Sequence, residues 1–102
     1  MNFFSYLNMI EPENLFNALQ TEQLQTIAIV LVHIDKDLAA DILNMFPADT
    51  RANIAIKMTA IDNLPEAVIK NIADILKNKI VPSAVKLGGV KAVAEILKRM
   101  KD

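Results

Sequence analysis

Residues 24–34 form a long apolar segment for which the rest of the chain offers no strand partner. Its centre, Ile27 to Val32, is purely apolar and rich in β-branched residues, so its composition alone is compatible with a buried strand or a buried helix. A strand without a neighbouring strand would leave its backbone amides and carbonyls unpaired. The segment is therefore predicted to be the central helix of an all-α fold.

Apolar residues recur at helical spacing on both sides of this segment. Pro12 suits the first position of a helix, and Thr21 and Asp35 are expected to cap the central helix and the one after it. The other expected helical stretches are residues 3–10, 12–19, 35–46, 48–61 and 63–80. Short helices with brief connections predict an array of stacked helix pairs, each of which buries its apolar face on the next.

The only two glycines, Gly88 and Gly89, lie side by side near the end of the chain, and Pro82 precedes them. Proline disfavours a helix interior and glycine gives the backbone freedom, so the pair is interpreted as a joint, although it could also simply start the last helix. Within one domain over residues 1–102, we expect a helical body (1–80), a connector with the Gly-Gly joint (81–89) and a terminal helix (90–102).

The terminal helix carries a narrow apolar stripe at helical spacing. Its residues are Val90, Val93, Leu97 and Met100. A stripe this narrow fits packing on one neighbour, which is either the chain's own body or a second copy, so these residues are candidates for self-association.

Charge is divided unequally along the sequence. Residues 1–50 hold seven acidic residues and one lysine, whereas residues 51–102 hold ten basic and five acidic residues. This division favours head-to-tail stacking of copies that weakens with salt, with an ordinary solvated surface as the alternative interpretation.

Composition excludes several functional classes. The absence of cysteine rules out disulfides, thiolate catalysis and cysteine-bound zinc, and the six-residue apolar run is far shorter than the ~18 residues of a membrane span. His33, the only histidine, is expected at the end of the central helix rather than in a catalytic or metal site. The lysines near the end of the chain lack aromatic neighbours that could stack on bases, so we expect no binding to nucleic acid. Taken together, these features predict a cytoplasmic protein that is not an enzyme, holds no cofactor or metal and does not insert into a membrane.

Four stretches resemble one known family. They are Phe4–Leu7 with Pro12–Leu15 and Leu19-Gln20, then Glu22–Ile29, Ala39–Leu43, and Gly88–Val90 with Ala94–Leu97. From Phe4 to about Met100 the chain resembles the FliG middle domain family of the flagellar motor switch. The resemblance implies an armadillo-like, right-handed stack of about five to six short helices.

The resemblance also implies a role in the bacterial flagellum and chemotaxis. The family binds the switch protein FliM through a Glu-His-Pro-Gln motif, with the Gly-Gly region as a second patch. By position, Glu22 and Gln25 match this motif, while Gln23 and Leu24 replace its histidine and proline. The implied partner-binding residues are Glu22, Gln23, Leu24, Gln25, Gly88 and Gly89, and the implied location is the cytoplasmic face of the flagellar basal body.

A second hypothesis is a cytosolic regulatory domain, because the amino-terminal domain of MgtE-type magnesium transporters has a similar helical stack. The acidic first half suits weak binding of a divalent cation near Asp35, Asp37 and Asp41.

Overall fold

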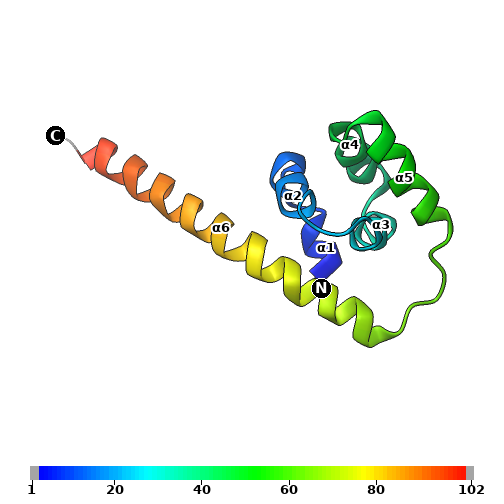
Figure 1. Cartoon of the computed structure of the whole chain (residues 1–102). Helices are drawn as coiled ribbons and strands as arrows, with labels where there is room; N and C mark the ends of the chain where they lie inside the picture. Colours follow the sequence, from blue (N-terminus) through cyan, green and yellow to red (C-terminus); the bar gives the residue numbers. More distant parts are fainter. Residues whose placement is uncertain (1–2, 101–102) are drawn as a thin grey trace.

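The computed structural model describes the backbone of residues 3–100 and the side chains of residues 3–80 and 96–99. Its helices are α1 (Phe3–Leu7), α2 (Pro12–Leu19), α3 (Leu24–His33), α4 (Lys36–Met45), α5 (Ala48–Thr59) and α6 (Glu66–Met100). No strand occurs within these residues, so the predicted all-α class is confirmed. Figure 1 shows α1 to α5 gathered into a body against which the first part of α6 lies.

Helix α3 occupies the centre of the body, as expected from its sequence. Ile27 to Leu31 are all buried, and α3 packs against both α4 and α5. The fully buried side chains around it come from α1, α2, α4, α5 and α6: Leu7, Leu15, Leu19, Ile42, Ile54 and Leu76. One continuous apolar core therefore holds all six helices together.

The helix starts differ from two details of the sequence prediction. Gln23 rather than Thr21 occupies the N-cap of α3. Asp35 does occupy the N-cap of α4, but its carboxylate makes no capping hydrogen bond. Its backbone N–H instead donates to the side-chain oxygen of Asn8 (2.8 Å), which ties the end of α1 to the corner between α3 and α4.

Helix α6 runs without interruption from Glu66 to Met100, so residues 81–89 are helical and do not form the expected connector. A proline costs about 3 kcal/mol and a glycine about 1 kcal/mol in a helix interior. The alanine and lysine residues that surround Pro82 and Gly88–Gly89 are good helix formers and offset part of this cost. Whether the glycine pair acts as a joint stays a prediction.

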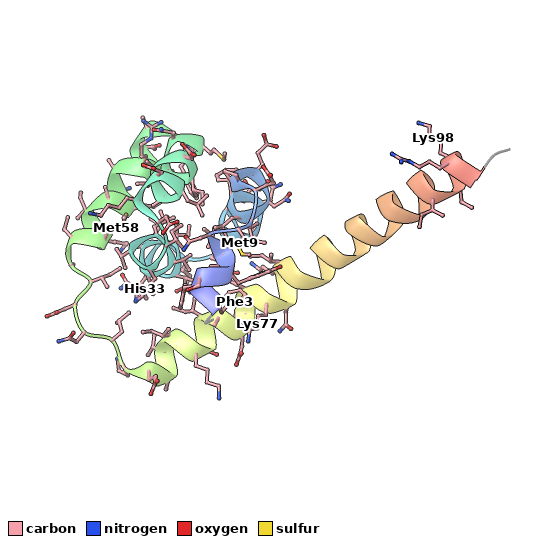
Figure 2. The ribbon with its side chains drawn as sticks, turned by 180° about the vertical axis from the view of Figure 1, so that it is seen from behind. Phe3, Met9, His33, Met58, Lys77 and Lys98 are labelled. Atoms are coloured by element: carbon pink, nitrogen blue, oxygen red, sulfur yellow. The ribbon has the colours of Figure 1, made fainter. Side chains whose placement is uncertain are left out.

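The two halves of α6 have different surroundings. Ile72, Ala73, Leu76 and Ile80 are buried, and this half packs on α2. Lys77 lies over the ring of Phe3, 5.6 Å from its centroid (Figure 2). Beyond Ile80 the helix extends away from the body (Figure 1), and no helix within the described residues is long and apolar enough to cross a membrane.

Candidate partner-binding surface

The corner between α2 and α3 carries four of the six expected partner-binding residues. The backbone N–H groups of Gln20 and Glu22 donate to the carbonyls of Phe16 (2.8 Å) and Leu19 (2.9 Å), so the chain leaves α2 in a tight turn. Leu19 and Ile27, on either side of the turn, are buried in the core. The corner is thus fixed from inside by apolar packing and from outside by backbone hydrogen bonds.

The four residues of this corner differ in what they offer to a partner. Gln23 and Gln25 are exposed, whereas Leu24 is partly buried and packs against the core. The side chain of Glu22 is only 16% exposed. The two glutamine amides are therefore the groups of this motif that a partner reaches first.

Lys79 of α6 occupies the position next to Glu22. Its ammonium forms an ion pair with the Glu22 carboxylate and donates to the carbonyl of Ala18 (3.2 Å) and the hydroxyl of Thr21 (3.0 Å). None of the sequence patterns described above singles out Lys79. No local signal reveals it, because the two charged residues are 57 positions apart.

Gly88 and Gly89 do not join this corner directly. Gly88 lies nine residues after Lys79 on the same helix, which is about 14 Å along the axis and roughly half a turn around it at 1.5 Å and 100° per residue. The two expected binding patches are thus connected by α6 but separated along it.

Of the expected self-association stripe, only Leu97 has a described side chain; those of Val90, Val93 and Met100 lie outside the described residues. Leu97 is 60% exposed and its neighbour Ile96 is 56% exposed. The basic residues Lys98 and Arg99 beside them are exposed as well, and Figure 2 places Lys98 far from the body.

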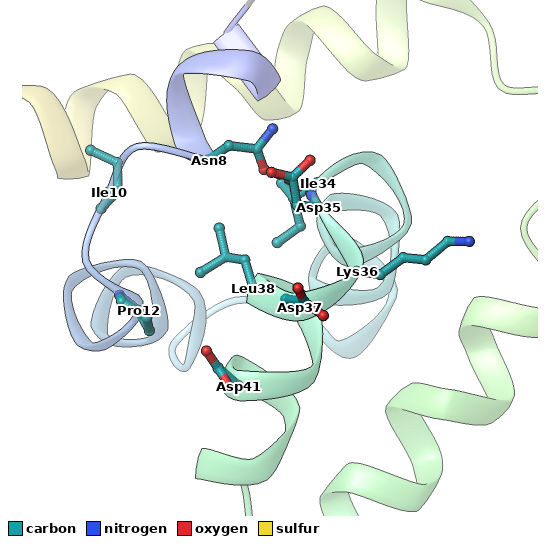
Figure 3. Close-up of a pocket in the computed structure, with 9 residues that line it drawn as sticks. All are labelled: Asn8, Ile10, Pro12, Ile34, Asp35, Lys36, Asp37, Leu38 and Asp41. Carbon is teal, nitrogen blue, oxygen red and sulfur yellow. Dashed lines mark hydrogen bonds between the residues drawn. The ribbon is translucent and has the colours of Figure 1, made fainter.

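A hollow lies between the end of α1 and the start of α4. Its lining residues are Asn8, Ile10, Pro12, Ile34, Asp35, Lys36, Asp37, Leu38 and Asp41 (Figure 3). Among residues 3–80 and 96–99, no three histidine, cysteine, aspartate or glutamate side chains are grouped so as to hold a metal ion. The aspartates named in the transporter hypothesis therefore share a hollow without forming a recognisable cation site.

His33 is the last residue of α3, as expected. Its Nδ1 donates to the carbonyl of Ile29 (2.6 Å), and its ring stacks on Phe4 with 5.0 Å between centroids. These contacts give the histidine a local role at the helix end, against α1.

Comparison with known proteins supplies the family. Residues 12–84 match the family described as the FliG middle domain. The flagellar motor switch protein FliG of Helicobacter pylori is 35% identical over 100 residues, covering 95% of this chain and 29% of the relative. That of Thermotoga maritima is 32% identical over 101 residues, covering 95% and 30%. The chain thus spans about 30% of the length of these relatives.

A solved structure agrees with the sequence matches. The chain is similar to one chain in the crystal structure of the FliG–FliM complex from H. pylori, with a TM-score of 0.71 and 35% identity over 76% of this chain and 98% of that one. This similarity supports the armadillo-like fold, and the matches give no support to the magnesium-transporter hypothesis.

Proposed function

The chain belongs to the FliG middle domain family, and on this basis we propose that it is a non-enzymatic protein-interaction module of the flagellar motor switch. Its task is to present a folded helical surface to other switch components. The family supports a location at the cytoplasmic face of the flagellar basal body.

The proposed partner is a FliM-like switch protein. The observation that carries this proposal is the match, at 35% identity, to nearly the whole of a chain from the crystal structure of a FliG–FliM complex. The exposed amides of Gln23 and Gln25, beside Glu22 and Leu24, supply the polar contact surface. Gly88 and Gly89 are proposed as the second patch.

The terminal half of α6 is proposed to mediate self-association. Exposed Ile96 and Leu97 provide apolar area, and Lys98 and Arg99 provide charge opposite to that of the first fifty residues. Val90, Val93 and Met100 complete the proposed stripe on sequence grounds.

Isothermal titration with purified H. pylori FliM tests the partner. We expect the chain to bind, and Gln25→Lys to weaken binding about tenfold or more, since a lysine at a contact position removes an amide and adds an unpaired charge. Asn53→Lys makes the same change of charge on the exposed surface of α5 and should leave the affinity unchanged. Failure of the unaltered chain to bind would reject a FliM-like partner, and equal effects of both variants would reject the proposed surface.

A further inference from the structure

The backbone of α6 around Lys79 is fixed by packing on the core of the body. It lies between Leu76 and Ile80 in sequence, and both of these residues are buried, with exposed fractions of 0% and 4%. Its own side chain is 33% exposed. The position of the ammonium group is therefore set by how α6 packs on α2.

On the other side, all three hydrogens of the Lys79 ammonium have a partner at the α2–α3 corner. The carbonyl of Ala18 belongs to the last turn of α2, where backbone carbonyls lack helical partners and the helix dipole favours a positive charge. The Thr21 hydroxyl and the Glu22 carboxylate belong to the turn itself. One side chain thus connects α6 to the end of α2 and to the start of the candidate surface.

The Glu22 carboxylate is directed toward α6 rather than toward solvent. A partner that used this carboxylate directly would have to displace Lys79 from it, whereas the neighbouring glutamine amides are already free to be contacted. Displacing one member of a partly buried pair leaves the other without its counter-ion, which is costly.

We infer that Glu22 acts through Lys79, as a positioning pair that holds Gln23 and Gln25 in their binding geometry, and that the packing of α6 thereby sets the affinity of the surface. This inference rests on the proposed FliM-like partner. It has a reciprocal consequence. A partner that binds more tightly when the Lys79–Glu22 ion pair is formed also stabilises the packing of α6 on the body, by the same coupling free energy.

A double-mutant cycle tests the inference, with binding to purified H. pylori FliM as the first readout. We expect Lys79→Met and Glu22→Gln each to weaken binding about three- to tenfold, and the double variant to bind no more weakly than the worse single variant, because both remove the same interaction. Lys79→Arg, which retains charge and donors, should stay within about twofold of the unaltered chain. Lys70→Met removes an exposed lysine from the same helix and should have no effect.

Amide hydrogen exchange of residues 20–25 is the second readout and needs no partner. Lys79→Met should speed exchange in this segment while Lys70→Met does not, and circular dichroism should show both variants folded. If the losses of affinity in the two single variants multiply in the double variant, Glu22 contacts FliM itself. Unchanged amide exchange of residues 20–25 in Lys79→Met would overturn the positioning role of the Lys79–Glu22 pair. If the unaltered chain does not bind FliM, the proposal of a FliM-like partner is rejected. The exchange result then still decides whether the Lys79–Glu22 pair positions residues 20–25.

Discussion

At the scale of single residues, two isoleucines of α5 have opposite surroundings. Ile54 is fully buried against α3, whereas Ile56, two positions later, is 66% exposed. Helical periodicity separates them by about 200° around the axis, so one faces the core and the other faces away.

The same substitution at these two positions should therefore have very different effects. Ile54→Ala should lower the free energy of unfolding by about 2–5 kcal/mol, because it removes buried methyl groups and leaves a cavity. Ile56→Ala should change it by less than about 0.5 kcal/mol. Urea denaturation of both variants measures the difference, and similar losses at the two positions would mean that α5 is rotated about its axis relative to this packing.

Sequence patterns predict which apolar residues are buried better than they predict which polar residues pair with one another. The burial of Ile54 follows from apolar spacing within one helix. The pairing of Lys79 with Glu22, and the hydrogen bond from Asp35 to Asn8, join residues 57 and 27 positions apart. Such contacts depend on how helices are placed in space. The candidate surface stays a prediction from the family resemblance, and its link to α6 could not be predicted from the sequence.

At the scale of helices, the sequence predicts that a helix is present better than it predicts how far the helix extends. The lack of any strand partner for residues 24–34 correctly predicts α3 as the central helix. The continuity of the last helix is missed, because Pro82 and the two glycines predict a connector over residues 81–89 where α6 continues. A proline removes one backbone hydrogen bond, and the neighbouring turns keep the helix intact.

Gly88→Pro tests how far α6 depends on its outer half. A proline there, next to the helix-disfavouring Gly89, should kink the helix and loosen its neighbouring turn, at a cost of about 3 kcal/mol, and lower the helical circular dichroism signal. The unfolding midpoint of the body should not change, since the buried residues of α6 with described surroundings end at Ile80. If Gly88–Gly89 is a joint used in binding, FliM affinity or self-association should change as well.

Gly88→Ala is the matched control for that variant. Alanine favours the helix by about 1 kcal/mol over glycine, so the helical signal should rise or stay constant while the body is unaffected. A lower unfolding midpoint in Gly88→Pro would indicate that the outer half of α6 packs on the body.

At the scale of the whole molecule, α6 determines the shape. Its 35 residues make a rod of about 52 Å at 1.5 Å per residue, close to the longest dimension of the molecule, 59 Å. The acidic residues of the first half lie on or beside α2, α4 and the start of α5, all within the body, whereas exposed Lys98 and Arg99 lie at the far end of α6. Residues 3–80 hold ten acidic and six basic residues, so the body carries an excess of negative charge, and the exposed basic pair lies away from it at the end of an elongated molecule.

This arrangement predicts self-association that depends on salt. In sedimentation velocity experiments, copies should associate more strongly at about 50 mM than at about 500 mM sodium chloride, because the Debye length falls from roughly 14 Å to 4 Å and screens the attraction between ends. Leu97→Asp should weaken association at both salt concentrations, since it places a negative charge in the apolar stripe, while Asn53→Asp makes the same net charge change on α5 and should not. A monomer under all conditions would reject self-association, and association insensitive to salt but abolished by Leu97→Asp would assign it to the apolar stripe alone.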